Sequence, residues 1–256
     1  MRKALCILVA SVSLFVQCKS DAGTAGENRL PGKGEVLSLV QSGKRVTMTT
    51  SDNVVIVGTL YAAETKSPVV LCLHQWRSDR SHFDGLSVVL QKQGFTVLSI
   101  DMRGHGESVR KKDAGMVTAD RNAIPDIRAA LAFLKSEASA DVSRVAIVGA
   151  SYGSSNAIMY AVTEPSIKAI VLLSPGLNYF NVLPIEPALA QFARGALLAV
   201  ASAEDLRSVE AVEKIKGLAK TELTTKIFDN AGHGTDILDA NVGLQEMIVQ
   251  FLKKNL

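Results

Sequence analysis

The amino-acid sequence predicts an α/β protein in which a mostly parallel sheet of eight strands carries helices on both faces. From Lys44 onward, short apolar runs typical of buried parallel strands alternate with segments of helical periodicity. The first two strand-like runs, Arg45–Thr50 and Val54–Tyr61, are separated only by Ser51-Asp52-Asn53, which favours a hairpin. A hairpin followed by repeated strand–helix units predicts an open sheet between two helical layers.

The remaining elements follow from apolar runs and from apolar residues at helical spacing. The runs predict six further strands, at Val69–Leu73, Phe95–Ile100, Val145–Val148, Ala169–Leu173, Ala196–Val200 and Thr225–Phe228. Helical spacing predicts helices that begin near Phe83, Ile124, Ser155, Val209 and Leu244. Gly94 is placed to end the first helix, Pro125 is tolerated in the first turn of the second, and Asp120 is its candidate cap.

Composition excludes several classes of protein. The chain has 256 residues, which suits one domain of ordinary size, and 28 basic against 25 acidic residues give a net charge of only +3. This dispersed charge does not favour a nucleic-acid surface. No apolar run reaches the ~20 residues that a membrane-spanning helix needs. The three cysteines, Cys6, Cys18 and Cys72, are spaced too irregularly for a disulfide framework or a zinc site, and we expect no metal.

The first residues have the pattern of an export signal. Arg2 and Lys3 precede an apolar segment of thirteen residues, so we expect residues 1–17 to be a cleaved signal peptide. Cys18 at the end of this segment resembles the acylated cysteine of bacterial lipoproteins, although Gln17 stands where a small residue is usual. The resemblance implies a lipidated Cys18 that binds the lipid bilayer. The Gly-, Ser-, Lys- and Glu-rich composition of residues 18–44 predicts a flexible tether, and the alternating strands and helices predict a folded domain over 45–256. The alternative is an ordinary secreted protein with a free thiol at Cys18.

One motif points to nucleophilic chemistry. Gly149-Ala150-Ser151-Tyr152-Gly153 has the pattern G-x-S-x-G between a predicted strand and a predicted helix. In that context a sharp turn projects the serine hydroxyl above the sheet, and the small flanking residues let the chain pass closely. The alternative is a tight turn that happens to contain a serine.

Two later residues complete a catalytic set. Asp205 and His233 each follow a predicted strand, so they are expected at the same sheet edge as Ser151. A serine needs a base to take its proton, a histidine titrates near neutrality, and an aspartate orients the imidazole ring. Glu204 is the rival acid.

The other three histidines occupy different places. His74 and His105 lie in turns beside earlier strands, and His82 opens a helix, which leaves His233 as the base by position. The alternatives are that His233 and Asp205 merely cap the helices that follow them.

These motifs resemble the α/β-hydrolase family, especially its dienelactone-hydrolase-like and small serine-esterase members, over residues 45–256. The remaining motifs that carry the resemblance are Leu73-His74-Gln75-Trp76 and Asp101-Met102-Arg103-Gly104-His105-Gly106-Glu107-Ser108, the latter interpreted as a structural turn. The resemblance implies an oxyanion hole formed by the backbone amides of Trp76 and Tyr152. Many relatives have glycine where Gln75 stands, and we expect glutamine to adopt the torsions of that position only at a cost.

The expected function is hydrolysis of a small carboxylic ester through an acyl-serine, without a cofactor. About twenty residues separate Ser174 from Ala196, which leaves room for a short helix but not for a large lid domain. The residues that are expected to line a pocket are His74, Gln75, Trp76, Tyr179, Phe180 and Leu183. A proline-type peptidase, a thioesterase, an acyltransferase and a non-catalytic binding protein remain alternatives, and the sequence predicts no oligomeric state.

Overall fold

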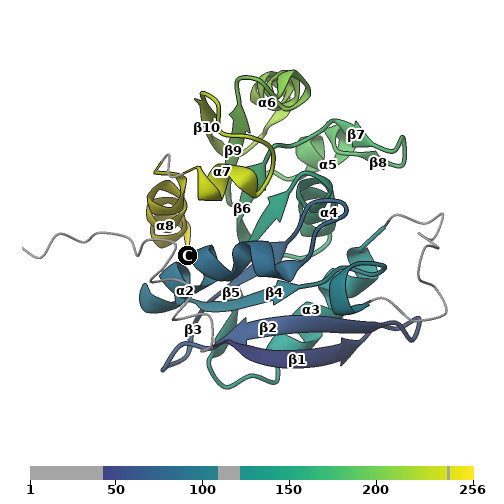
Figure 1. Ribbon diagram of the computed structural model, residues 1–256, viewed down its shortest axis with the longest axis vertical. Helices are drawn as coiled ribbons and strands as arrows, with labels where there is room; N and C mark the ends of the chain where they lie inside the picture. The colour runs from purple at the N-terminus through teal and green to yellow at the C-terminus, as the bar shows by residue number, and fades with distance from the viewer. Residues whose placement is uncertain (1–42, 109–121, 241–242) are drawn as a thin grey trace, which may run out of the picture.

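A single eight-stranded sheet organises the chain (Figure 1). The structure is a computed structural model that describes residues 43–108, 122–240 and 243–256. The first two strands in the sheet order pair antiparallel with their neighbours, and the others run parallel. In spatial order the strands are β1 (Lys44–Thr49), β2 (Val55–Tyr61), β4 (Thr96–Ile100), β3 (Ser67–Leu73), β5 (Ala140–Ala150), β6 (Ile167–Leu173), β9 (Ala196–Ser202) and β10 (Glu222–Phe228). The predicted fold class is confirmed.

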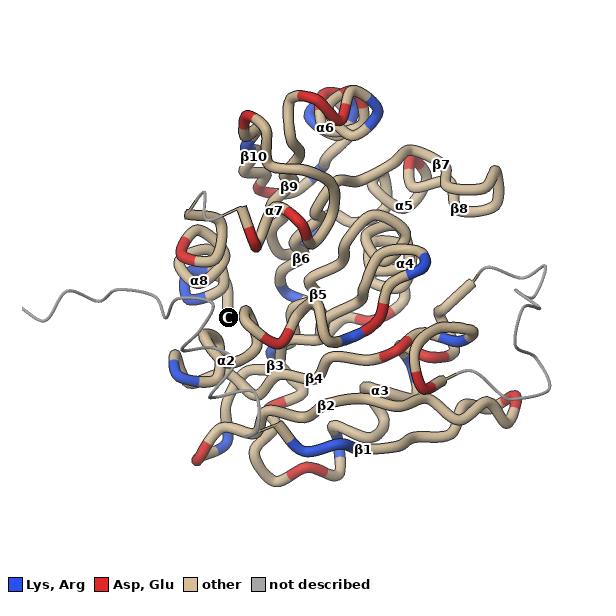
Figure 2. Tube along the Cα trace, in the orientation of Figure 1, with Lys and Arg blue, Asp and Glu red and all other residues tan. Residues whose placement is uncertain are grey.

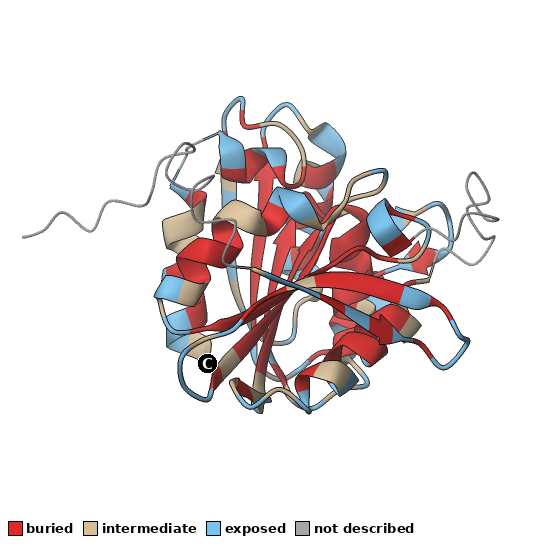
Figure 3. Cartoon of the chain, turned by 60° about the horizontal axis from the view of Figure 1, so that its bottom comes forward, coloured by how far each residue is buried: buried red, intermediate tan, exposed pale blue. Residues whose placement is uncertain are grey.

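Helices cover both faces of this sheet and enclose two apolar cores. On one face the core contains residues of α3 (Ile124–Leu134), α4 (Tyr152–Ala161) and α6 (Leu206–Leu218). On the other it contains residues of α2 (Asp84–Lys92), α7 (Asp236–Asp239) and α8 (Leu244–Asn255). Figure 3 shows the buried strands between helices whose outer positions are exposed. Both layers follow from the near-continuous apolar runs of the central parallel strands, which must be covered on each side.

Several elements begin earlier than the apolar pattern predicts, among them β5, α4 and α6. Strand β5 starts at Ala140 rather than Val145, because its first residues are polar yet still pair with β3. Helix α4 starts at Tyr152 and α6 at Leu206, directly after Ser151 and Asp205 respectively. Polar or small residues in a first turn escape a count of apolar spacing. The candidate cap Asp120 lies outside the described residues.

The segment between β6 and β9 contains only small elements. A two-stranded hairpin of β7 (Asn178–Tyr179) and β8 (Leu183–Pro184) is followed by α5 (Glu186–Gln191). Figure 1 shows this hairpin beside α5, beyond α4. The expectation of a short helix and no large lid is confirmed.

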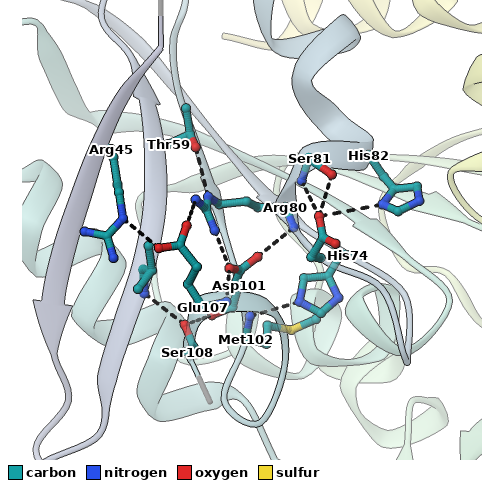
Figure 4. A network of polar contacts seen from close by, with 12 residues as sticks. Arg45, Thr59, His74, Arg80, Ser81, His82, Asp101, Met102, Glu107 and Ser108 are labelled. Carbon is teal, nitrogen blue, oxygen red and sulfur yellow. Dashed lines mark hydrogen bonds and ion pairs between the residues drawn. The ribbon is translucent and has the colours of Figure 1, made fainter. Parts of the chain in front are cut away.

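The turn that contains Asp101 is a structural support (Figure 4). The buried Asp101 carboxylate accepts hydrogen bonds from the amides of Arg80 and Glu107, at 2.7 and 2.8 Å, and pairs with the Arg80 guanidinium. The Ser108 hydroxyl donates to the Asp101 carbonyl at 2.7 Å and accepts from the Val57 amide at 2.9 Å. These contacts connect the turn after β4 to the 3₁₀ helix η2 (Arg80–Phe83) and to β2, which gives the motif the structural role expected of it.

The described helices were compared with the length and apolar character that a membrane span needs. None of the described helices is both long and apolar enough to cross a bilayer. Figure 2 shows acidic and basic residues interspersed on α6 rather than gathered by sign.

Candidate active site

Ser151 lies at a strained turn between β5 and α4. Its backbone has φ 49° and ψ −113°, a left-handed conformation that costs a residue with a Cβ of the order of 1–3 kcal/mol. Its amide donates to the Leu173 carbonyl of β6 at 2.7 Å, and its carbonyl accepts from the Ser154 amide at 2.9 Å. The turn is therefore held from both sides, and only 5% of Ser151 is exposed.

The two glycines of the motif allow this turn to form. A Cβ on Gly149 would lie 2.5 Å from the Gly153 carbonyl oxygen. A Cβ on Gly153 would collide with the Leu73 carbonyl and lie 2.8 Å from that of His74. Because these neighbours are backbone atoms, they cannot move aside as a flexible side chain does. The G-x-S-x-G pattern thus reflects close packing of the turn against the end of β3.

Asp205 and His233 are in direct contact. Nδ1 of His233 lies 2.6 Å from Oδ2 of Asp205, although 28 residues separate them in sequence. Burial raises the pKa of Asp205, but hydrogen bonds from Ser208 and His233 outweigh this effect and hold it below its usual value. The ionised carboxylate can therefore accept a hydrogen bond from Nδ1–H, which leaves Nε2 as the ring nitrogen that can accept a proton.

Glu204 has different partners. Its carboxylate accepts hydrogen bonds from the amides of Asn230 and Gly232, at 3.0 and 2.8 Å, and from the Ser202 hydroxyl at 2.6 Å. The Ser202 bond and these amides lower the pKa of Glu204 to about 2. Glu204 thus supports the loop that carries His233, whereas Asp205 contacts the imidazole ring itself. Of the two acids considered from the sequence, Asp205 is the one in this position.

The His233 loop lies against the serine turn. The Gly234 amide donates to the Ser174 hydroxyl at 2.8 Å, and a Cβ on Gly234 would lie 3.6 Å from the Cβ of Ala150. Ala150 directly precedes Ser151 in the chain. The ends of β5, β6, β9 and β10 therefore bring Ser151, Asp205 and His233 to one edge of the sheet, as the strand order requires.

The loop after β3 forms another wall of the site. The rings of Trp76 and Tyr152, whose amides are the expected oxyanion donors, meet edge to face with centroids 5.3 Å apart. In the described chain, Gln75 is not among the residues with positive φ, whereas Arg77 adopts φ 60°. The conformational cost expected for Gln75 therefore does not arise, because the left-handed residue of this loop is Arg77.

Aromatic rings gather beside the serine turn. Trp76 contacts Phe180 of the β7–β8 hairpin at 4.9 Å and His105 at 4.7 Å between centroids. Phe180 also approaches Tyr152, at 6.2 Å. Phe180, Val182 and Leu206 are exposed large apolar residues, and Leu206 directly follows Asp205. An apolar surface thus borders the candidate site.

Two residues expected in the pocket are enclosed in the protein interior. His74 is fully buried, and both of its ring nitrogens have partners inside the protein. Nδ1 donates to the Gln75 carbonyl at 2.7 Å, and Nε2 accepts from the Met102 amide at 3.0 Å. Leu183 is 1% exposed and belongs to the apolar core below the hairpin. Their side chains therefore offer no surface to a substrate, and the expectation that they line the pocket is corrected.

The hydroxyl of Tyr179 lies beside the turn that contains Ser151. Its hydroxyl donates to the Ser174 carbonyl at 3.0 Å. Burial raises the pKa of Tyr179, while hydrogen bonding with the side chains of Ser151 and Ser208 opposes this change. The hydroxyl therefore stays protonated next to the serine turn. No sequence signal distinguishes it from the neighbouring aromatic residue, Phe180.

In the described ranges, no group of three or more histidine, cysteine or acidic side chains is arranged to hold a metal ion. The groups that the site does offer are a serine hydroxyl in a strained turn, a histidine paired with a carboxylate, and an apolar wall. Such a set suits proton transfer and nucleophilic attack.

Comparison with known proteins places the chain in a family. The model of the alpha/beta hydrolase fold family matches residues 68–211, more than half of the chain. The protein belongs to this family.

Individual relatives are more distant. An uncharacterized protein of Mycobacterium tuberculosis is 26% identical over 236 residues, which cover 84% of this chain and 81% of that protein. A thiohydrolase of Arthrinium phaeospermum is 29% identical over 142 residues, or 54% of this chain and 45% of that one.

Solved structures share the fold. A dienelactone hydrolase from Anabaena variabilis has a TM-score of 0.69 at 18% identity, covering 84% of this chain and 99% of its own. A Pyrococcus furiosus esterase has a TM-score of 0.65 at 20% identity, covering 83% and 90%. The family match and these neighbours agree on the α/β-hydrolase fold of the chain.

Proposed function

We propose that the protein is a serine hydrolase that cleaves carboxylic esters through an acyl-serine intermediate. Oγ of Ser151 attacks the carbonyl carbon while Nε2 of His233 takes its proton. The tetrahedral intermediate then expels the alcohol, which receives that proton. Water, deprotonated by the same histidine, attacks the acyl-serine, and the acid product leaves as Ser151 is restored.

The contact between His233 and Asp205 is the observation that carries this proposal. At 2.6 Å, the carboxylate holds the imidazole in the tautomer whose Nε2 is a base and stabilises the imidazolium that forms. The strained turn at Ser151, directly after β5, supplies the nucleophile.

The oxyanion is assigned to two backbone amides, those of Trp76 and Tyr152. Both residues border Ser151 or the loop packed against it, and Tyr152 is the first residue of α4, where the helix dipole favours negative charge. Each donor of this kind contributes roughly 10²–10³ in rate. The reaction requires no metal or organic cofactor.

The substrate that we propose is a small ester with an apolar group. Support comes from the rings of Trp76, Tyr152 and Phe180 and from the exposed Val182 and Leu206. The absence of a lid domain between β6 and β9 favours a compact substrate over a long one.

The proposal is tested with p-nitrophenyl acetate and longer acyl chains, with Ser151→Ala as the control. We expect turnover of the esters, an increase in kcat/KM from acetate to butyrate, and no turnover by the variant. A thioester belongs in the same panel, because one relative is a thiohydrolase. Turnover of thioesters or prolyl peptides without turnover of esters would reject the ester assignment.

We further propose that the protein is exported and anchored to a membrane through acylated Cys18. The basic residues Arg2 and Lys3, the apolar segment and Cys18 support this placement. All of them lie outside the described residues.

A further inference from the structure

Gln75 connects two loops of the site that lie far apart in sequence. Its Oε1 accepts hydrogen bonds from the Thr235 amide at 2.8 Å and from the Thr235 hydroxyl at 3.1 Å, across 160 residues of chain. Thr235 is 2% exposed and lies two residues after His233. A side chain expected to face a substrate thus has its oxygen directed at the histidine loop.

The backbone of Gln75 is itself held in place. Its carbonyl accepts from the His74 ring at 2.7 Å and from the Ser78 amide at 3.2 Å. The side chain therefore forms a bridge with both ends fixed. One end is adjacent to Trp76, whose amide is an assigned oxyanion donor, and the other holds the loop of the assigned base.

Side-chain oxygens from three strand ends hold the histidine loop. The hydroxyl of Ser202, the last residue of β9, accepts from the Ala231 amide, and that of Ser174 after β6 accepts from the Gly234 amide, each at 2.8 Å. Glu204 accepts from Gly232. Gln75 completes the series on the β3 side. Without it, the part of the loop that follows His233 loses two hydrogen bonds to the loop that carries Trp76.

Gly234 shows how closely this bridge fits. It has φ 63°, and a Cβ at this position would collide with Oε1 of Gln75. The side-chain amide group of Gln75 thus occupies the space that a side chain at residue 234 would need. The glutamine, the glycine and the threonine form one packed unit.

We propose that Gln75 is a positioning residue that fixes the loop of His233 against the loop of Trp76. It sets the distance between the base and the oxyanion donors and does not contact the substrate. This inference rests on the proposed function. A group held a fraction of an ångström from its productive position loses much of its rate advantage, whereas substrate binding elsewhere is little affected.

The test compares Gln75→Met with Gln91→Met. Methionine keeps the length of the side chain but cannot accept the two bonds from Thr235. Gln91 is a matched control on α2, because its amide donates to the Ala62 carbonyl at 2.8 Å and makes a comparable bond at the surface. We expect Gln75→Met to lower kcat on p-nitrophenyl acetate by roughly 10- to 100-fold with KM within about threefold. Thr235→Val, which removes only the hydroxyl donor, should give a smaller loss of kcat.

The rate of fluorophosphonate labelling of Ser151 and the Tm are measured on each variant. Both glutamine variants should fold, and only Gln75→Met should label more slowly than the wild type. Equal kcat in Gln75→Met and the wild type would overturn the inference, as would a rise in KM at unchanged kcat, which would identify Gln75 as a substrate contact. If Gln75→Met fails to fold, Thr235→Val decides, and unchanged kcat in that variant overturns the inference. A wild type that neither labels nor turns over esters would instead reject the proposed function.

Discussion

Asp205 and Glu204 are adjacent in the chain, yet they serve different partners. Asp205 contacts the His233 ring, whereas Glu204 accepts from backbone amides of the loop that carries it. The Asp205 carboxylate caps α6 with one oxygen and contacts the His233 ring with the other. The Glu204 carboxylate lies against the turn after β10. In the proposed mechanism, Asp205 therefore orients the base, and Glu204 supports the loop that carries it.

This division predicts the outcome of two substitutions. Asp205→Asn should lower kcat roughly 10³- to 10⁴-fold, because the amide no longer holds the imidazole in the productive tautomer. Glu204→Gln keeps an acceptor for the loop amides and should cost far less. Steady-state kinetics on a p-nitrophenyl ester compare the two variants, and a larger loss in Glu204→Gln would reassign the acid.

His74 makes stability depend on pH. Burial lowers its pKa to about 4 from a usual 6.5. As the pH falls through 6.5 the unfolded chain binds a proton that the folded protein still excludes, so the free energy of unfolding decreases until about pH 4, by roughly 3 kcal/mol in total. His105, whose pKa burial also lowers, acts in the same direction.

Urea unfolding at pH 7 and pH 4.5 measures this dependence. His74→Gln should reduce the loss of stability on acidification, because it removes the buried imidazole. Equal pH dependence in the wild type and His74→Gln would show that His74 is not the group responsible.

The β7–β8 hairpin adds apolar side chains to the edge of the sheet where the candidate site lies. It carries Phe180 onto Trp76 and contributes the exposed Val182. Because the hairpin follows β6 directly, its short length leaves the serine turn reachable while adding an apolar wall. A small element therefore takes the place that a helical lid occupies in larger hydrolases.

Removal of one ring from this hairpin should affect apolar substrates selectively. Phe180→Ala is expected to lower kcat/KM for a butyrate ester roughly tenfold, about 1.4 kcal/mol, and to change that for acetate less. Val55→Ala removes an exposed apolar residue of β2 and serves as the control. Equal losses for both esters would mean that Phe180 supports the fold rather than the substrate.

For the whole molecule, the sequence predicts the layers well and the long-range contacts poorly. The apolar runs of β3, β6 and β9 locate the centre of the sheet, because fully buried parallel strands need them. The strand ends then bring Ser151, Asp205 and His233 together. The bond between Gln75 and Thr235 and the enclosure of His74 depend on loop geometry, which no local pattern encodes.

The proposed membrane anchor at Cys18 is tested by cell fractionation. Cys18→Ser should shift the protein from the membrane fraction to the soluble fraction, because the proposal places the membrane-binding acyl chains on this cysteine. Cys72→Ser is the control, since that thiol is buried in β3. Membrane binding that survives Cys18→Ser would show that another feature holds the protein there.

The proposed mechanism requires Ser151 to be a nucleophile that His233 activates. A fluorophosphonate probe tests it most directly, with the labelled residue located by peptide mass spectrometry. We expect one probe adduct on Ser151 in the folded wild type, no adduct in Ser151→Ala, and labelling of His233→Ala at least about 10²-fold slower. A folded wild type that does not label at Ser151, or His233→Ala that labels as fast as the wild type, would contradict it.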